Sequence, residues 1–206
     1  MKKNLALLLN ELQGIGQSGK KYGHDIFDQE RYDQLLVVTG ELMALLTDWD
    51  QAQIAHYLYT DDGYATPKVD IRGVVFVADK LLLVREKSDN KWALPGGWGD
   101  VGFSPFEIAA KEIYEEAGIM VKPVQLMAVK DKAKHDYPAS LTYVYKFFIY
   151  CEALDTAIKT GIETAEVGFF SLSECEKLPL SLARTTLTDL KEAFSYHTHP
   201  ANTHCD

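Results

Sequence analysis

The feature that most constrains this sequence is a glycine-rich segment that runs directly into a short helical pattern, over residues 94–119. The glycines of the first half allow the backbone to turn tightly and to approach a ligand closely. Ser104 is expected to be the N-cap of the helix and Pro105 its first residue, and Glu107 completes a capping box. Gly118 is the expected C-terminal stop.

Three glutamates form an acidic stripe along this helix. At about 100° per residue, Glu112, Glu115 and Glu116 fall on one side. Like charges four residues apart destabilise a helix by roughly a few tenths of a kcal/mol, and carboxylates in the last turn oppose the helix dipole. A divalent cation would reverse both effects, because hard cations such as Mg²⁺ join carboxylates to substrate phosphates. A solvated acidic face is the ordinary alternative, but the adjacent glycine-rich loop favours a metal site.

The helix face beside the stripe is expected to enter the core. It consists of small and apolar residues: Phe106, Ala109, Ala110, Ile113 and Ala117.

The whole segment resembles the Nudix box, the signature of hydrolases that cleave nucleoside diphosphates linked to another moiety. Gly97 matches the first glycine of the signature. The second half is matched by Glu112, Ile113, Glu115, Glu116, Gly118 and Ile119. The resemblance implies that Glu112, Glu115, Glu116 and the backbone carbonyl of Gly97 hold Mg²⁺, with Mn²⁺ as an alternative. It also implies an α/β/α sandwich with a mixed sheet over about residues 69–194, an α+β fold preceded by a small all-α domain.

Two positions depart from the signature. Phe103 stands where the family has glutamate, and Lys111 stands where it has arginine. In the family these two residues are expected to pair and to brace the loop on the helix. Packing of Phe103 and a helical Glu107–Lys111 pair are the available replacements for that brace. The departure bears on loop geometry more than on catalysis, because the metal-binding positions are intact.

Charge and composition exclude several classes of function. The chain has 206 residues, enough for one good core and a small second domain. Its formal net charge of −9 argues against general nucleic-acid or anionic-membrane binding, and means that an anionic substrate needs local cations. The three scattered cysteines are typical of reduced thiols in a cytoplasmic protein. The apolar run at residues 5–9 is too short for a signal peptide, and no segment predicts a membrane span.

The N-terminal third is expected to be a separate helical domain. Residues 1–62 form this domain and residues 63–206 the Nudix domain, with a turn-rich linker around residues 60–67. Helix-spaced leucines predict a first helix, a break at residues 14–23, a second helix with Asp28 as its N-cap, and a third near residues 50–59.

These amphipathic helices are too few to bury their apolar faces alone, which favours packing on the rest of the chain or a homodimer. Direct contact with substrate is the alternative. Together with the segment YATPKVDIRG, the region resembles a Nudix subgroup that contains the CDP-choline pyrophosphatases.

The remainder of the chain alternates between strand and helix patterns. Apolar and β-branched runs predict strands over residues 69–78, 81–86, 92–94, 124–131, 141–151 and 165–170. A helical pattern follows over residues 171–194, with a break at Leu178–Pro179. The polar tail from Ser195 contains His197, His199, His204 and Cys205. It is expected to be disordered, with metal binding as the alternative.

Several side chains are candidates for catalysis and substrate binding. Glu116 and Glu163 are the candidates for the general base that deprotonates the attacking water. Arg72 and Arg85 lie in predicted strands next to the box, and arginine offers a planar fork for phosphate oxygens.

A basic cluster with Lys130, Lys132, Lys134 and His135 is expected to hold a phosphate or a nucleotide edge, and a solvated loop is the alternative. Asp70 and Tyr137 are candidate contacts to base or ribose, although sheet packing is the ordinary role of such a tyrosine.

The sequence therefore favours a Mg²⁺-dependent pyrophosphohydrolase whose substrate is a small-molecule nucleoside diphosphate derivative. CDP-choline, cleaved to CMP and phosphocholine, is the first expectation, and ADP-ribose or a nucleotide sugar is the alternative. A nucleotide sensor without catalysis is an alternative of another class, against which the intact acidic stripe argues. A hydrolase of RNA ends is disfavoured by the acidic net charge.

Overall fold

The computed structural model describes residues 5–206, which divide into two compact units. One unit contains the described residues up to Pro67 together with Ala139–Tyr143. The other contains Lys68–Pro138 and Val144–Asp206. None of the helices in the described part of the chain is long and apolar enough to cross a membrane.

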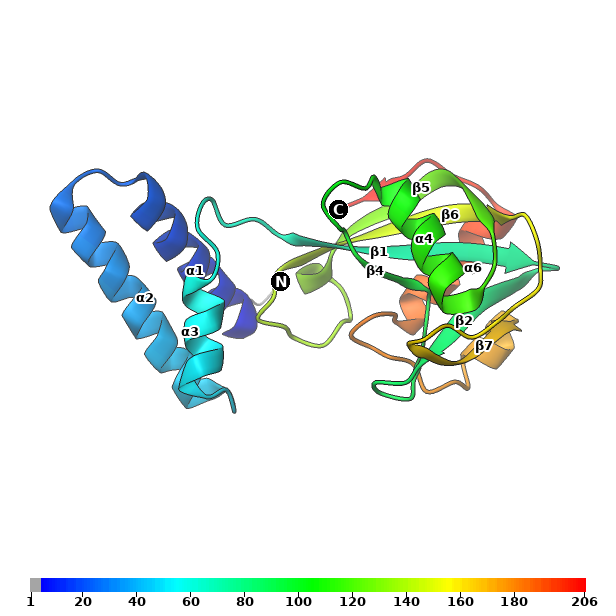
Figure 1. Ribbon diagram of the computed structural model, residues 1–206, viewed down its shortest axis with the longest axis horizontal. Coiled ribbons are helices and arrows are strands. Elements are labelled where there is room, and N and C mark those ends of the chain that lie inside the picture. The colour runs from blue at the N-terminus through cyan, green and yellow to red at the C-terminus, as the bar shows by residue number, and fades with distance from the viewer. Residues whose placement is uncertain (1–4) are drawn as a thin grey trace. The chain divides into compact units, whose positions relative to one another are not determined.

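The first unit consists of three helices (Figure 1), as the leucine spacing predicted: α1 (Leu5–Tyr22), α2 (Ile26–Leu46) and α3 (Gln51–Tyr59). Its core contains Leu9, Leu36, Met43, Ile54 and Leu58. The segment 139–143 belongs to this unit through backbone carbonyls. The Tyr57 hydroxyl donates to the carbonyl of Leu141 at 2.6 Å, and the Asn10 amide donates to that of Ser140 at 3.1 Å.

The predicted break within the first helix was wrong, because α1 continues through residues 14–22. A Cβ at Gly16 would come within 2.6 Å of Leu36, and a Cβ at Gly19 would come within 2.2 Å of the Tyr32 ring. These glycines let α1 and α2 approach closely, so their reason is tertiary packing and not a turn. A local pattern does not distinguish the two.

The second helix also starts earlier than predicted. Its N-cap is Asp25 and not Asp28: the Asp25 carboxylate accepts from the backbone amides of Phe27 at 2.9 Å and Asp28 at 3.2 Å. Asp28 instead pairs with Arg31 at 2.7 Å in the first turns of the helix. Both aspartates are of the residue type that caps helices, and only the position of the preceding turn separates them.

We expect Gly19→Ala to destabilise the helical unit by about 1–3 kcal/mol, because the added methyl group overlaps the Tyr32 ring. Gly14→Ala is the matched control in the same helix, since its Cβ would meet Ala65 at an ordinary 3.6 Å. The control is expected to gain up to about 1 kcal/mol from helix propensity. Urea unfolding followed by circular dichroism measures both. Equal stabilisation by the two changes would show that the close packing is not needed.

The second unit is built on a mixed sheet, as expected. Its strands are β1 (Lys68–Val77), β2 (Lys80–Glu86), β3 (Trp92–Ala93), β4 (Gly96–Trp98), β5 (Val121–Asp131), β6 (Val144–Ala153), β7 (Thr164–Phe170) and β8 (His204–Cys205). The order is β3-β2-β1-β6-β5-β8, with β4 paired to β1 and β7 paired to β2. The pairs β1–β6 and β5–β8 are parallel, and the others are antiparallel.

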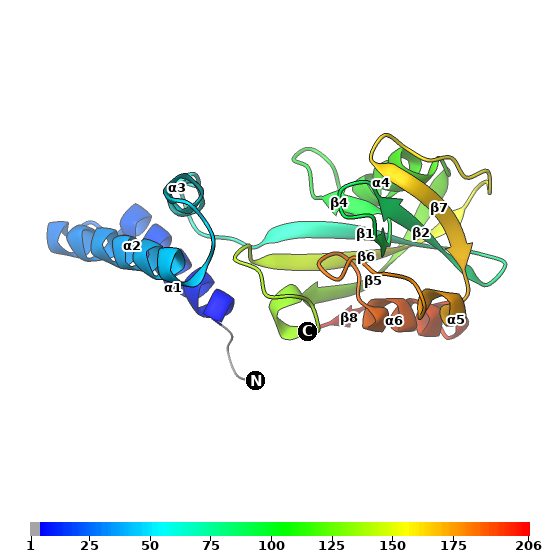
Figure 2. The same cartoon turned by 90° about the horizontal axis from the view of Figure 1, so that it is seen from below.

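Helices cover both faces of this sheet, so the predicted α/β/α sandwich is confirmed. Figure 2 shows α4 (Pro105–Ala117) on one side and α5 (Leu172–Cys175) and α6 (Leu187–Thr198) on the other. Along β1, Ile71 and Val75 join the α4 core, whereas Val74 and Phe76 join the α6 core. This alternation follows from the two-residue repeat of a strand.

Several strand and helix boundaries differ from prediction. Strand β5 begins at Val121, three residues early, and passes Pro123 with an irregularity in its pairing to β6. Strand β6 begins at Val144, because the preceding residues belong to the helical unit. The helical run predicted over residues 171–194 is two helices, α5 and α6, separated by a longer irregular stretch than the Leu178–Pro179 break.

The expectation of a disordered tail was wrong. Helix α6 continues to Thr198, and β8 adds a parallel strand to β5. The imidazole of His197 stacks on the Phe76 ring with 4.0 Å between centroids and hydrogen-bonds the Tyr150 hydroxyl at 2.8 Å. The polar composition hid these contacts, because they are made to strands far away in the sequence.

Candidate active site

The helix of the glycine-rich segment forms with the predicted caps. The Ser104 hydroxyl accepts from the backbone amide of Glu107 at 3.3 Å, and the Glu107 carboxylate accepts from the amide of Ser104 at 2.8 Å. Gly118 ends the helix with a φ of 74°, in the left-handed region that favours glycine. The buried face contains Ala109, Ile113 and Ala117 as expected, together with Ile108. Phe106 is 38% exposed and is not a core residue.

The glycine-rich loop is held between β1 and α4. Strand β4 pairs with β1 so that Gly97 lies opposite Ile71. Gly96 has a φ of 145°, and a Cβ there would lie 2.0 Å from the carbonyl oxygen of Ile71. A Cβ at Gly97 would lie 3.0 Å from the Glu112 carboxyl carbon. Gly96 therefore needs glycine, a Cβ at Gly97 would press on the Glu112 carboxylate, and the two glycines bring the loop backbone directly against the acidic stripe.

A pocket of about 870 Å³ opens above this contact. Its acidic lining residues are Asp70, Glu86, Asp100, Glu112, Glu115, Glu116 and Glu163. Its basic lining residues are Arg72, Lys111, Lys132 and Arg184. Because carboxylates outnumber cations, an anionic ligand would be repelled unless a metal ion entered with it.

Glu116 is the carboxylate in the least favourable position for a charge. It is 7% exposed, accepts one hydrogen bond from the backbone amide of Gly96 at 2.9 Å, and forms no ion pair with any residue in the range 5–206. Burial raises the pKa of Glu116 to about 8, and burial also raises the pKa of Glu112. The charge of Arg72 opposes this shift without forming an ion pair, and a buried carboxylate without an ion pair is a site that a cation would stabilise.

The loop brace takes a form that neither sequence alternative described. The Lys111 ammonium contacts the carboxylates of Glu115 at 3.2 Å, Glu112 at 3.3 Å and Asp100 at 3.8 Å. Glu107 is occupied in the capping box, so the expected Glu107–Lys111 pair is absent, and Phe103 is 51% exposed. Asp100 therefore provides the loop carboxylate that position 103 lacks.

These residues fit a hard divalent cation. Within the described range 5–206, no three acidic, histidine or cysteine side chains are gathered into a ready-made metal cluster. Lys111 holds Glu112 and Glu115, while the Gly96 amide holds Glu116. The donors are nonetheless all oxygens of the kind that Mg²⁺ prefers, and one of them is a buried carboxylate without an ion pair. The histidine-rich tail offers no such set in the part of the chain that the structure describes.

Asp70 and Arg72 reach the pocket, as an ion pair. The Asp70 carboxylate accepts from Arg72 Nη2 at 2.7 Å and from Lys146. Burial alone would raise the pKa of Asp70, but the charges of Arg72 and Lys146 outweigh it and hold that pKa below its usual range. Burial lowers the pKa of Lys146 to about 8. The guanidinium fork of Arg72 is therefore already occupied by Asp70.

Four residues expected to bind substrate have other partners. Arg85 pairs with Glu166 across β2 and β7. Lys130 and Tyr137 contact the carboxylate of Asp189, at 2.9 Å and 2.7 Å.

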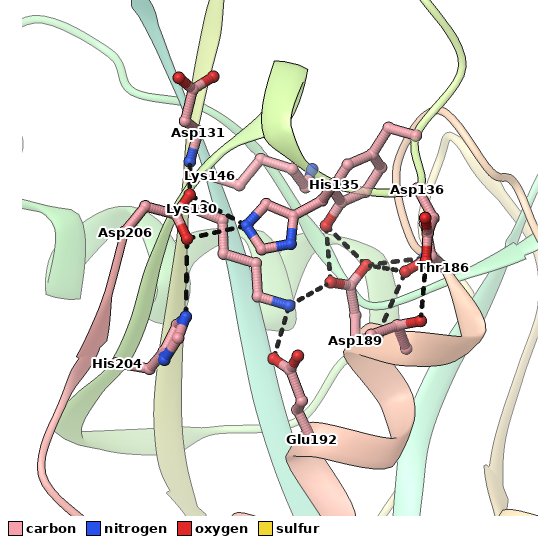
Figure 3. A network of polar contacts seen from close by, with 12 residues as sticks. Lys130, Asp131, His135, Asp136, Lys146, Thr186, Asp189, Glu192, His204 and Asp206 are labelled. Carbon is pink, nitrogen blue, oxygen red and sulfur yellow. Dashed lines mark hydrogen bonds and ion pairs between the residues drawn. The ribbon is translucent and has the colours of Figure 1, made fainter. Parts of the chain in front are cut away.

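Figure 3 shows Lys130 directed towards Asp189 and Glu192, and His135 towards Asp206. The distance from His135 Nε2 to the Asp206 carboxylate is 2.9 Å. None of the four residues Arg85, Lys130, His135 and Tyr137 lines the pocket. The structure thus gives them structural contacts in place of the substrate contacts expected from the sequence.

Glu163 lies at the pocket rim with an exposed side chain. Its loop is fixed to the end of α4, where the amide of Gly161 and the hydroxyl of Thr164 both donate to the carbonyl of Glu116, at 3.2 Å and 2.8 Å. The Lys87 amide holds the carbonyl of Glu163 at 2.9 Å. Backbone hydrogen bonds on both sides therefore position the loop that carries Glu163.

Several lining residues were not predicted from the sequence, among them Glu86, Trp98, Asp100 and Arg184. Lys132 was predicted only as one of four residues in a basic cluster, and the sequence did not indicate that it alone of the four lines the pocket. Arg184 comes from a turn in which the amide of Ser181 donates to the carbonyl of Trp92 at 2.8 Å. No local pattern predicts that contact across 89 positions of the numbering, so Arg184 had no sequence signal.

Two family models match the chain. A model described as "UDP-X-like, N-terminal oligomerisation domain" matches residues 3–58. The NUDIX domain model matches residues 66–190 and so spans more than half of the sequence.

Named proteins resemble the chain over most of its length. The Bacillus subtilis protein "Putative ADP-ribose pyrophosphatase YjhB" is 41% identical over 189 residues, 92% of this chain and 90% of that protein. The solved structure of an ADP-ribose pyrophosphatase from Streptococcus suis is 38% identical, covers 68% of this chain and all of its own, and has a TM-score of 0.61. A structure of a UDP-X diphosphatase is 31% identical, covers 97% of this chain and 96% of its own, and has a TM-score of 0.63.

Proposed function

The chain belongs to the Nudix family of hydrolases and is a pyrophosphatase of that family, and from this premise we propose that it cleaves ADP-ribose at its diphosphate bridge. The products would be AMP and ribose 5-phosphate. The observation that supports this most is the acid-lined pocket, in which the buried carboxylate of Glu116 lies next to the Gly96–Gly97 backbone. A diphosphate bridge is anionic, so it requires compensating positive charge in such a pocket.

We propose that Glu112, Glu115, Glu116 and the carbonyl of Gly97 hold Mg²⁺. Bound Mg²⁺ would supply neutralisation of the bridge charge, and Mn²⁺ has the same preference for oxygen ligands. Glu163 is the favoured general base, because its exposed carboxylate at the rim is free to accept a proton from the attacking water. Glu116 is less suited to that role, since its carboxylate is buried and already accepts from the Gly96 amide.

We expect Mg²⁺ affinity to rise between pH 6 and pH 8. Without metal the pKa of Glu116 is about 8, so below that pH the carboxyl carries a proton that the cation must displace. Titration calorimetry at pH 7 in two buffers of different ionisation enthalpy would then show proton release on Mg²⁺ binding. Glu116→Gln is expected to abolish the release. A pH-independent affinity with no proton release in the wild type would place the cation elsewhere.

The substrate assignment rests on the relatives and revises the expectation from the sequence. The Bacillus subtilis relative, 41% identical, is named "Putative ADP-ribose pyrophosphatase YjhB", and the Streptococcus suis structure, 38% identical, is that of an ADP-ribose pyrophosphatase. CDP-choline, expected first, receives no support from them. A UDP-linked sugar is the second candidate, because the UDP-X diphosphatase structure resembles nearly the whole chain and the family model that matches residues 3–58 is described as UDP-X-like.

A panel assay tests the proposal. Phosphate release with Mg²⁺ and a coupled phosphatase would be followed for ADP-ribose, UDP-glucose, CDP-choline, a dinucleoside polyphosphate and a capped RNA. ADP-ribose should give the highest kcat/KM, and EDTA should abolish it. A higher kcat/KM for UDP-glucose or CDP-choline would reassign the substrate. Thermal stabilisation by one nucleotide without turnover would instead support the sensor.

We further propose that the helical unit mediates a homodimer. The unit leaves large apolar side chains on its surface, among them Phe27 at 62% exposure, Val37 at 52% and Leu45 at 80%. Exposed apolar groups of this number on a small helical unit are typical of a protein interface. The matching family model carries the description of an oligomerisation domain. Light scattering would measure the molar mass of the full chain and of the double variant Val37→Glu/Leu45→Glu. The wild type should have the mass of a dimer and the variant that of a monomer.

A further inference from the structure

Three of the four cations that line the pocket are bound to carboxylates of the protein. Arg72 is held by Asp70 at 2.7 Å, and Lys111 by Glu115 at 3.2 Å. Arg184 lies 3.2 Å from Asp89 and 3.7 Å from Glu86. The positive charges of these three residues are already neutralised by neighbouring carboxylates, so they add little attraction for an anionic substrate.

Lys132 is different. It lines the same pocket and is half-buried, and its side chain forms no hydrogen bond or ion pair with any described residue in the range 5–206. Burial lowers the pKa of Lys132. The charge of Asp70 opposes this shift and the charge of Arg72 adds to it, so the ammonium lies within electrostatic range of the Asp70–Arg72 ion pair. An ammonium that is partly desolvated without a partner is costly unless a ligand supplies the partner.

The backbone around Lys132 is fixed. Residues Lys132–Lys134 form a 3₁₀ turn, in which the backbone amide of Ala133 donates to the Asp131 carboxylate at 3.0 Å. The Asp206 carboxylate accepts from the amide of Asp131 at 2.7 Å and lies 2.9 Å from His135 Nε2 (Figure 3). The turn is thus anchored before and after Lys132, so the fold fixes the point at which its side chain leaves the backbone.

We propose that Lys132 binds phosphate oxygens of the substrate's diphosphate and so determines affinity for it; this inference rests on the proposed function. The carboxylates of the pocket bind metal, whereas Lys132 contributes a positive charge that belongs to the protein and is not matched within it. We expect Lys132 to bind the diphosphate equally well in the ground state and the transition state, because a lysine that only matches phosphate charge contributes uniform binding.

The test compares Lys132→Met with Lys134→Met. Both lysines lie on the same turn, but Lys134 has a side chain 54% exposed, pairs with Asp131 at 3.6 Å and does not line the pocket. Lys132→Met is expected to raise KM about 10- to 100-fold with kcat changed by less than about 3-fold, as for loss of one charge-assisted hydrogen bond. Lys134→Met should leave both constants unchanged, and Lys132→Arg should restore part of the affinity.

A binding experiment separates this inference from the proposed function. Methylene-bridged analogues of ADP-ribose and UDP-glucose, which cannot be cleaved at the bridge, would be titrated in the presence of Mg²⁺, because the carboxylates of the pocket repel an anion that enters without a metal ion. A loss of about 10-fold or more in Lys132→Met alone supports the inference. Unchanged binding in Lys132→Met, or equal weakening in both variants, overturns it while leaving hydrolysis by the wild type intact. If the wild type neither binds nor cleaves any panel compound, the proposed function and the inference both fail.

Discussion

Replacing Glu116 by glutamine is expected to lower kcat by about three orders of magnitude while the fold stays intact. The change removes a carboxylate that is 7% exposed and has no ion pair among residues 5–206, so it removes the charge that a divalent cation would meet. An interaction of several kcal/mol with that cation corresponds to a rate loss of this size. The glutamine oxygen is still able to accept from the Gly96 amide, so the contact between loop and helix is preserved.

The same variant should be at least as stable as the wild type in EDTA. A buried carboxylate whose pKa is about 8 is poorly solvated when charged, and glutamine carries no charge. Glu152→Gln is the control for loss of one acidic charge, because Glu152 has a side chain 57% exposed and pairs only with Lys122 at the surface, at 3.7 Å. The measurement is kcat on the best panel substrate together with the melting temperature. A near wild-type kcat for Glu116→Gln would remove Glu116 from the reaction.

Asp70→Ala is expected to destabilise the sheet unit by about 3–5 kcal/mol. The substitution leaves Arg72, 5% exposed, and Lys146, fully buried, without the carboxylate that both contact. Breaking a buried ion pair from one side has this cost because a charge is left in a region that cannot solvate it. Lys146 can relieve part of the cost by losing its proton, since its pKa is already about 8, but Arg72 cannot.

Urea unfolding monitored by circular dichroism would measure the loss. The double variant Asp70→Ala/Lys146→Met should be more stable than Asp70→Ala alone, because one stranded cation is removed. Glu152→Ala breaks a surface pair with Lys122 and is expected to change stability by less than about 1 kcal/mol. Equal losses of unfolding free energy in Asp70→Ala and Glu152→Ala would mean that the buried ion pairs of Asp70 contribute no more to stability than a surface pair.

The parts of the molecule that the sequence predicted are those whose cause is local. Ser104, Glu107 and Gly118 fix the ends of α4 by contacts within a few residues, and they formed as expected. The placing of Glu112, Glu115 and Glu116 on one face follows from the helix repeat alone. The core helices and strands were also located correctly because their apolar periodicity extends over many residues.

The parts that were missed have causes far away in the chain. Gly16 and Gly19 resembled a turn because their reason is the packing of α2. Lys130 and Tyr137 resembled substrate contacts because their partner, Asp189, lies more than fifty residues further on. In the same cluster, whether Lys130 or Lys132 faces the pocket depends on the 3₁₀ turn at the end of β5. The sequence predicts a basic loop from its composition. Only the tertiary structure shows that Lys130 is buried and that Lys132 lines the pocket.

The membership of residues 139–143 in the helical unit has a consequence for how the chain folds during synthesis. The hydroxyl of Tyr57 and the amide of Asn10 cannot form their hydrogen bonds to the carbonyls of Leu141 and Ser140 until those residues have been synthesised, some eighty to one hundred and thirty residues later. Strand β1 likewise cannot pair with β6, its parallel neighbour, until β6 has been synthesised. Neither unit is complete until the middle of the second has been translated, so a high contact order should make folding slow and nearly simultaneous in both. An N-terminal fragment that stops at the linker would therefore be an unfinished unit and not a domain.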